Sequence, residues 1–188
     1  MDADNGSIHI LGNDITHLKD GALNEVRKNI GFLFQSAALY DSMTVNENLK
    51  FPLRDIKDKS TTEIDTLVQE SLESVGLPDA GNLMPAELSG GMRKRIGLAR
   101  TMILKPELML YDEPTTGLDP ITSKEISKLI LEVQKKLQTT SIIITHDIEC
   151  ARITANRMII IKDGVCAAEG TYKELAQSTD EWVRSFFE

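Results

Sequence analysis

The stretch that decides the fold is Leu88-Ser89-Gly90-Gly91-Met92, followed further along the chain by Leu108-Met109-Leu110-Tyr111-Asp112-Glu113. The first part predicts a glycine-rich turn that opens an amphipathic helix, where backbone N–H groups can bind an anion. The second part predicts a buried strand that ends in two neighbouring carboxylates. The chain contains no Gly-x-x-x-x-Gly-Lys-Ser/Thr phosphate loop, and none of its glycines is followed by lysine.

The composition indicates a globular protein with an acidic surface. A chain of 188 residues with 41% hydrophobic and 27% charged residues can form one ordinary domain with a core. The net charge of -8 argues against nonspecific attraction to nucleic acid or anionic lipid, because counterion release needs a basic surface. A short basic run, Arg93 to Arg95, is the exception.

The sequence shows no sign of a membrane span or a secretion signal. No apolar stretch approaches the roughly 18 residues that a spanning helix needs. The first residues, Met1 to Asp4, are acidic and polar. Cys150 and Cys166 lack metal-site spacing, so we expect free thiols in a reducing cytoplasm.

Hydrophobic periodicity predicts strands that alternate with helices. The predicted strands are residues 7–11, 30–34, 108–111, 141–145 and 158–161. The predicted helices are residues 23–29, 45–49, 61–75, the segment from the glycine-rich turn to Pro106, 123–137, 172–177 and 181–187. Such an order implies a mostly parallel sheet covered on both faces. In the last segment, we expect Trp182, Val183, Phe186 and Phe187 to pack on the chain itself, with a protein interface as the alternative.

Polar side chains follow three of the predicted strands, where the ligands of parallel α/β sheets bind. Gln35 follows the strand 30–34, Asp112 and Glu113 follow 108–111, and His146 with Asp147 follows 141–145. Each residue alone is more often a solvated surface group than a functional one. Their order along the chain, however, favours a functional role for the set as a whole.

In this order the motifs resemble those of the ATP-binding cassette (ABC) ATPases, over essentially the whole chain. Gln35 resembles the Q-loop glutamine, residues 88–92 the family signature, and residues 108–113 the Walker B strand with its catalytic glutamate. Residues 117–119 resemble the D-loop and His146 the switch histidine. The resemblance implies an α/β fold of the P-loop NTPase type, with three layers around a mostly parallel sheet, and an added helical ABC subdomain.

The resemblance also implies ATP and Mg²⁺ as cofactors and assigns a role to each residue. Asp112 and Gln35 are expected to hold Mg²⁺, which prefers oxygen ligands and keeps its waters. Glu113 is expected to act as general base on the attacking water, and His146 to contact the γ-phosphate.

The family's signature acts on a nucleotide held by a second subunit. Ser89, Gly90 and Gly91 are therefore expected to bind the γ-phosphate of the opposite subunit's ATP, with Asp119 at the same homodimer interface. The other partners that the resemblance implies are integral membrane permease subunits and a small accessory subunit, at the cytoplasmic face of the inner membrane. Nucleic acid is not among them.

A narrower resemblance is to the phospholipid-trafficking cassettes of the lipid-asymmetry, or toluene-tolerance, type. It rests on residues 34–39, 43–45, 48, 83–92 and 119–122, including Met92 in place of the usual glutamine. The alternatives are a cassette protein without a transport role and a pseudoenzyme that serves in assembly.

The resemblance divides the chain into an incomplete RecA-like ATPase core, a helical ABC subdomain and a C-terminal helical segment, over residues 1–35 with 97–170, 36–96 and 171–188. The family's first strands and phosphate loop would precede Ser7, so we expect a fragment of a longer protein, with a naturally truncated chain as the alternative. We expect the 188 residues alone to lack ATPase activity. We also expect poor solubility or dependence on a partner, because the absent strand would leave an open edge beside the strand 108–111.

Overall fold

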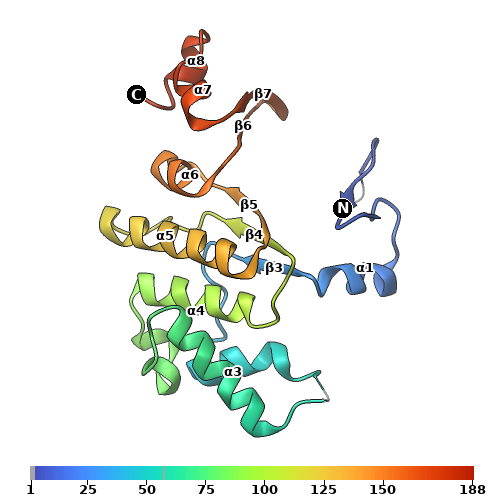
Figure 1. The fold of residues 1–188 in the computed structure, drawn as a ribbon, viewed down its shortest axis with the longest axis vertical. Helices are drawn as coiled ribbons and strands as arrows, with labels where there is room; N and C mark the ends of the chain where they lie inside the picture. The colour runs from blue at the N-terminus through green and yellow to red at the C-terminus, as the bar shows by residue number, and fades with distance from the viewer. Residues whose placement is uncertain (1–2, 57) are drawn as a thin grey trace.

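The computed structural model describes residues 3–56 and 58–188, which form an elongated stack of α and β layers (Figure 1). The strands are β1 (His9–Ile10), β2 (Asn13–Asp14), β3 (Ile30–Leu33), β4 (Leu108–Asp112), β5 (Thr140–Ile144), β6 (Met158–Lys162) and β7 (Val165–Gly170). The helices are α1 (Asp20–Arg27), α2 (Val45–Lys50), α3 (Thr61–Ser74), α4 (Gly90–Met102), α5 (Pro120–Leu137), α6 (Ile148–Thr154), α7 (Tyr172–Ala176) and α8 (Glu181–Arg184). Three 3₁₀ turns, Phe51–Leu53, Ala80–Asn82 and Pro85–Glu87, connect α2, α3 and α4.

The central sheet is parallel, with the strand order β3-β4-β5. Strand β3 pairs with β4 from Ile30 opposite Leu108, and β4 pairs with β5 from Leu108 opposite Thr140. The hairpins β1-β2 and β6-β7 form separate antiparallel pairs. The prediction of a mixed α/β fold around a parallel sheet is therefore confirmed.

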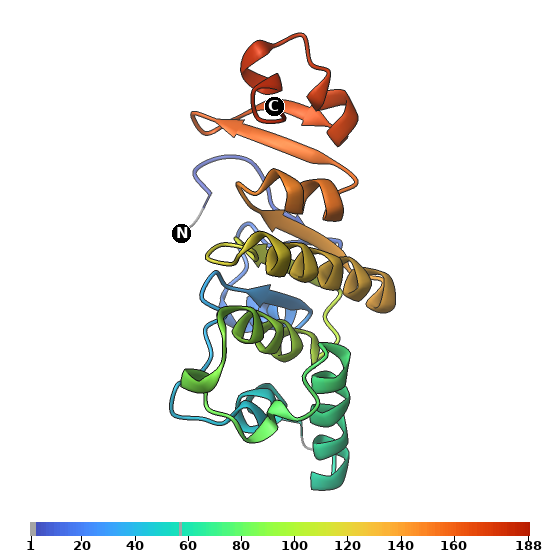
Figure 2. The same cartoon turned by 90° about the vertical axis from the view of Figure 1, so that its left-hand side faces the viewer.

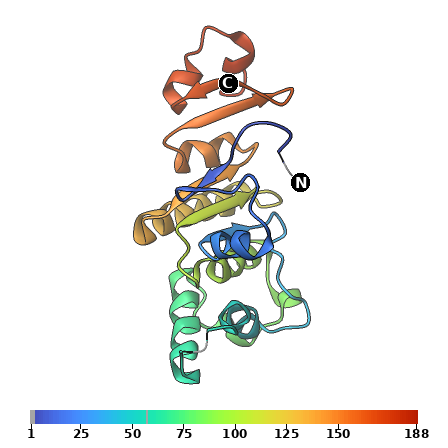
Figure 3. The same ribbon diagram turned by 90° about the vertical axis from the view of Figure 1, so that its right-hand side faces the viewer.

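In the described part of the chain, α4 and α5 cover one face of this sheet, whereas its other face is largely exposed. Met109 and Tyr111 are buried on the side of α4 and α5, whereas Phe32, Ile142 and Ile144 on the other side are 41%, 55% and 65% exposed. The prediction that both faces are covered is thus wrong for these residues. The strand order β3-β4-β5 advances in one direction, so right-handed crossovers place α4 and α5 on the same side (Figures 2 and 3).

The open edge of the sheet is not where the sequence predicted it. Strand β4 has a strand partner on each side, β3 and β5, so no edge lies beside it. Within the described residues, β5 pairs only with β4, and β6 pairs only with β7. Among the described strands, the edges of the central sheet are therefore β3 and β5, and α6 connects the edge strand β5 to β6 of the hairpin.

The helices between β3 and β4 begin and end as their sequences dictate. Capping boxes start α2 and α3, with Thr44 paired to Glu47 and Ser60 paired to Glu63. Gly76, with φ of +72°, follows the end of α3. Val68 and Leu72 of α3 are buried in the core that also contains Ile96 and Leu98 of α4.

The C-terminal segment packs on the chain itself, as predicted for most of its apolar side chains. Val183 is buried, and the rings of Tyr172 and Phe187 meet edge to face with centroids 5.2 Å apart. The ammonium of Lys162 on β6 lies 4.2 Å from the centre of the Trp182 ring. Phe186 remains 42% exposed. Among the described residues, no helix combines the length and the hydrophobicity that crossing a membrane requires.

Candidate functional site

The three parallel strands end at one edge of the sheet and bring four predicted site residues to it. Asp112 is the last residue of β4, Glu113 follows it, Gln35 follows β3 and His146 follows β5. Gln35 and Asp112 line the same hollow of about 430 Å³, together with Phe34, Ser36 and Thr116. The structure therefore unites side chains that are far apart in the sequence.

The carboxylate of Glu113 is held by the strand beside it and by its own loop. Its Oε1 atom lies 2.8 Å from Nδ1 of His146 and accepts a hydrogen bond from the His146 backbone N–H at 3.2 Å. Its Oε2 atom accepts a bond from the hydroxyl of Thr116 at 2.9 Å, and the hydroxyl of Thr145 lies 3.4 Å away. The Glu113 side chain is 20% exposed and the His146 side chain 78%, so the histidine faces solvent.

These contacts shift both pKa values toward the ionised pair. Burial alone would raise the pKa of Glu113, but the hydrogen bonds from His146 and Thr116 outweigh it and lower the pKa below 4.5. The hydrogen bond to Glu113, helped by its charge, raises the pKa of His146 above 6.5. Glu113 is therefore a carboxylate at neutral pH, able to accept a hydrogen bond from a water molecule.

The backbone of Glu113 adopts an unusual conformation that a lysine of α4 stabilises. Its φ angle of +46° lies in the left-handed region, which costs a non-glycine residue about 1–3 kcal/mol. Nζ of Lys94 donates to the Glu113 carbonyl oxygen at 2.9 Å, and the Glu113 N–H donates to the carbonyl of Ile144 at 2.9 Å. Lys94 is only 5% exposed. Burial lowers the pKa of Lys94, while the charges of Asp112 and Glu113 oppose that shift.

The side chains of the basic run from Arg93 to Arg95 bond to backbone carbonyls of the chain itself. Arg93 donates to the carbonyl of Leu88 at 2.6 Å, and Arg95 donates to Val75 on the neighbouring segment at 3.1 Å. Lys94 makes the Glu113 contact just described. Sequence analysis missed this role, because charge spacing alone does not say which way a helical side chain points.

The loop that carries Gln35 is held by the same helix. Ala37 and Ala38 have φ angles of +62° and +46°, and the guanidinium of Arg100 donates to their carbonyl oxygens at 3.1 and 2.9 Å. A Cβ atom added at Gly97 of α4 would lie 2.7 Å from the Cβ of Ala37. Glycine at position 97 thus allows the loop to lie directly on α4, while Gln35 itself stays exposed.

The glycine-rich turn forms the N-terminus of α4, as predicted. The hydroxyl oxygen of Ser89 accepts a bond from the Met92 N–H at 3.2 Å, which makes Ser89 the N-cap. A Cβ atom at Gly91 would lie 2.7 Å from Cγ2 of Thr122, and one at Gly90 would lie 3.3 Å from Leu118. The turn therefore packs against the start of α5 and does not line the hollow of Gln35 and Asp112 within one chain.

Asp119, the predicted interface residue, is the N-cap of α5. Its Oδ1 atom accepts bonds from the N–H groups of Ile121 and Thr122, both at 3.0 Å. The hydroxyl bond from Thr122, followed by the backbone bonds, lowers the pKa of Asp119. This contact accounts for an aspartate at this position without reference to a partner.

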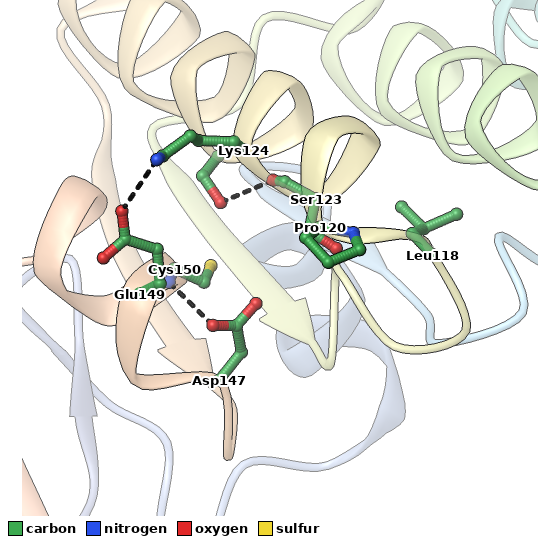
Figure 4. A pocket seen from close by; sticks show the side chains of 8 residues that line it. Leu118, Pro120, Ser123, Lys124, Asp147, Glu149 and Cys150 are labelled. Carbon is green, nitrogen blue, oxygen red and sulfur yellow. Dashed lines mark hydrogen bonds and ion pairs between the residues drawn. The ribbon is translucent and has the colours of Figure 1, made fainter. Parts of the chain in front are cut away.

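A second hollow, of about 230 Å³, lies between α5 and α6 and is lined by Asp147, but by none of the residues expected to contact the nucleotide or Mg²⁺ (Figure 4). Lys124 and Glu149 approach to 3.5 Å across it, and Asp147 accepts a bond from the Cys150 N–H at 3.0 Å. The hydroxyl of Thr115 also donates to Asp147 at 2.8 Å. Asp147 therefore connects the loop after β4 to the N-terminus of α6, which is a structural role.

The donor atoms at the first hollow fit a magnesium ion that retains most of its water. The amide oxygen of Gln35 and the carboxylate of Asp112 are both oxygen donors, and Mg²⁺ is usually bound through one or two protein ligands. Among the described residues, no group of three or more His, Cys, Asp or Glu side chains could hold a metal by protein ligands alone. The site therefore suits a hydrated ion.

Comparison with known proteins assigns the family. The family model described as "ABC transporter" matches residues 1–116. The chain is 43% identical to the intermembrane phospholipid transport system ATP-binding protein MlaF of Haemophilus influenzae, over 96% of the chain and 69% of that protein. It is 38% identical to MlaF of Escherichia coli K12, over 98% of the chain and 69% of MlaF.

It is also 40% identical to the probable ribonucleotide transport ATP-binding protein mkl of Mycobacterium tuberculosis H37Rv, over 96% of the chain. The chain spans only 50% of mkl.

A solved structure shares the fold as well. The dimeric ATP-binding cassette MJ0796, in a post-hydrolysis state bound to ADP and Pi, superposes with a TM-score of 0.80 at 30% identity. The match covers 91% of this chain and 75% of MJ0796. The chain belongs to the ABC transporter family, as an ATP-binding cassette domain with a P-loop NTPase fold.

Proposed function

We propose that this domain is part of a longer ATP-binding subunit that hydrolyses ATP at a head-to-tail dimer interface and so powers the movement of phospholipid, or another hydrophobic molecule, between membranes. The observation that carries the proposal is the contact of Glu113 with His146 beside the hollow of Gln35 and Asp112. The names of the MlaF relatives support phospholipid as the transported class.

In this proposal each residue at the edge of the sheet has one task. Glu113 accepts a hydrogen bond from a water molecule and takes its proton as the oxygen attacks the γ-phosphorus and ADP leaves. His146, which faces solvent, donates to the γ-phosphate. Gln35 and Asp112 hold the hydrated Mg²⁺, which neutralises charge on the phosphates.

The glycine-rich turn serves the nucleotide of the opposite subunit. The hydroxyl of Ser89 and the N–H groups of Gly90 and Gly91 bind that γ-phosphate at the N-terminus of α4, and Asp119 lies at the same interface. Support comes from the packing of this turn on α5, away from the hollow of Gln35 and Asp112 in its own chain. Each site then needs two copies of the chain.

The 188 residues alone are proposed to be inactive. A phosphate loop contributes about five charge-assisted bonds of 1.5–3 kcal/mol each. Without these bonds the gross binding free energy is smaller by on the order of 10 kcal/mol. Binding with a Kd of 1 mM corresponds to only about 4 kcal/mol. MgATP is therefore not held usefully by these residues.

The partners in this proposal are a second ATPase subunit, integral membrane permease subunits and a small accessory subunit, at the cytoplasmic face of the inner membrane. The helices α2 and α3 are the proposed permease-facing part, within the helical subdomain of residues 36–96. Nucleic acid is not a partner, which agrees with the net charge of -8.

The test uses the full-length protein reconstituted with its membrane subunits between donor and acceptor vesicles, with a fluorescent phospholipid as probe. Glu113→Gln should lower the rate of ATP hydrolysis about 10²- to 10⁴-fold and stop lipid transfer. Glu132→Gln, at an exposed position of α5, is the matched control and should keep both activities. Unchanged hydrolysis in Glu113→Gln would contradict the catalytic assignment, and hydrolysis without lipid movement would contradict the cargo.

A further inference from the structure

Two cationic side chains of helix α4 donate hydrogen bonds to two different loops of the site. Nζ of Lys94 donates to the carbonyl oxygen of Glu113 at 2.9 Å. The guanidinium of Arg100 donates to the carbonyl oxygens of Ala38 and Ala37 at 2.9 and 3.1 Å. The loops after β3 and after β4 are thus bonded to one helix.

The residues that accept these bonds share an unfavourable backbone conformation. Glu113, Ala37 and Ala38 all have positive φ angles, of +46°, +62° and +46°. A non-glycine residue keeps such a conformation only where its surroundings hold it there. The cations of α4 supply that constraint, because a charged donor makes a stronger bond to a carbonyl than a neutral donor does.

We propose that Lys94 and Arg100 are positioning residues of α4, with Lys94 holding the loop of Glu113 and Arg100 holding the loop of Gln35. The same helix begins with the turn of Ser89, Gly90 and Gly91, so all three parts of the site are attached to one rigid element. Neither cation acts on the substrate. Each cation holds a backbone segment in place, and the side chain carried by that segment, Glu113 or Gln35, is the one that acts on the substrate.

Arg95 provides the comparison that separates positioning from ordinary packing. It lies on the same helix and donates to the carbonyl of Val75 at 3.1 Å and to the carboxylate of Glu125 at 2.9 Å. Both bonds join α4 to neighbouring structure outside the two loops. Removing Arg95 therefore removes comparable bonds without touching the site.

The first test is hydrogen exchange of backbone amides in the full-length protein, which does not depend on activity. Lys94→Met should speed exchange in a peptide covering residues 113–119 and leave residues 34–40 unchanged. Arg100→Met should do the reverse, and Arg95→Met should change neither. Unchanged exchange of residues 113–119 in Lys94→Met, or equal loosening of both loops in all three variants, would overturn the proposal.

The second test is the steady-state rate of ATP hydrolysis, and it rests on the proposed function. Lys94→Met should lower kcat about ten- to a hundredfold through misplacement of Glu113, with the KM for ATP changed less than about twofold. Lys94→Arg, which keeps a cation, should recover part of the loss, and Arg95→Met should keep the wild-type kcat. A wild-type kcat in Lys94→Met would count against the role of Lys94.

Failure of the proposed function and failure of the proposed positioning role give different results in these two tests. If the wild-type protein does not hydrolyse ATP, the proposed function is wrong, while the exchange measurement still decides the roles of Lys94 and Arg100. If Lys94→Met does not fold, Lys94→Arg and Arg100→Met are compared by exchange. Wild-type exchange of residues 34–40 in Arg100→Met then overturns the proposal.

Discussion

Oε1 of Glu113 lies 2.8 Å from Nδ1 of His146, and this contact joins the loop after β4 to the end of β5. Both residues follow strands that are paired in register, Asp112 opposite Ile144. The contact is therefore set by the sheet, and it lowers the pKa of Glu113 and raises the pKa of His146.

The pH dependence of this pair follows from the two pKa shifts. The raised pKa of His146 contributes stability that is complete below pH 6.5 and is lost as the pH rises through the raised value. The lowered pKa of Glu113 contributes stability that is complete above pH 4.5 and is lost as the pH falls through the lowered value. Both contributions are thus present between pH 4.5 and 6.5, and one of them is lost as the pH passes the shifted pKa on either side.

We predict that His146 titrates above pH 6.5 in the wild-type protein and moves back toward 6.5 in Glu113→Gln. NMR titration of the imidazole nitrogens measures this, and His146→Gln identifies the resonances. Identical titration curves for His146 in wild type and Glu113→Gln would mean that the two side chains do not interact in solution.

We predict that Gly91→Ala loosens the packing of α4 on α5. The added methyl would lie 2.7 Å from Cγ2 of Thr122, and overpacking of this kind costs about 1–3 kcal/mol. Thr122→Ser removes that methyl but keeps the hydroxyl that bonds Asp119. The double variant should therefore regain most of the lost stability in denaturant unfolding. Additive effects of the two changes would show that the steric contact is not the cause.

We predict that Gly97→Ala displaces the loop of Gln35. The new Cβ would lie 2.7 Å from Cβ of Ala37 and 3.1 Å from Cδ1 of Leu33, and both neighbours are buried. The expected cost is about 1–3 kcal/mol in chemical unfolding, with faster hydrogen exchange in residues 34–40. Exchange of residues 34–40 at the wild-type rate in Gly97→Ala would contradict the predicted displacement.

We predict that the 188 residues expressed alone are poorly soluble and bind hydrophobic dyes. The open face of the sheet presents Phe32, Phe34, Ile142 and Ile144, which are 41–65% exposed. Ile142→Lys and Ile144→Lys should raise the soluble yield, whereas Ile121→Lys, at an exposed position of α5, should not. A monomer of the unaltered chain that melts in one sharp transition would refute the prediction.

Local signals in the sequence predicted most elements well. The apolar stripe and the Gly76 stop placed the third helix at residues 61–75, within one residue of α3. The fifth helix starts at Pro120 and not at Ser123, because Asp119 caps it and proline is tolerated in the first turn. Helix α6 and strand β7 were not predicted, since α6 is short and the run 165–170 lacks the continuous apolar pattern of a buried strand.

The sequence predicts which site residues lie at the ends of the strands. It does not predict the contacts that hold these residues in place. Gln35, Asp112, Glu113 and His146 each follow a parallel strand, so their convergence could be predicted. The contacts of Lys94, Arg100 and Asp147 depend on side-chain direction and on left-handed backbone at distant positions, which no short-range pattern encodes. The open edge was predicted beside the wrong strand for a related reason, because strand order is a property of the sheet and not of any single strand.

The pairing of Ile30 with Leu108 has a consequence for synthesis on the ribosome. Strand β3 leaves the ribosome long before β4, and at about 5–20 residues per second it waits for several seconds. The residues made in that interval form α2, α3 and α4, the last of which closes over Leu33 and the Gln35 loop. Helices α2, α3 and α4 are thus in a position to shield the nascent β3 from other chains until β4 has been synthesised.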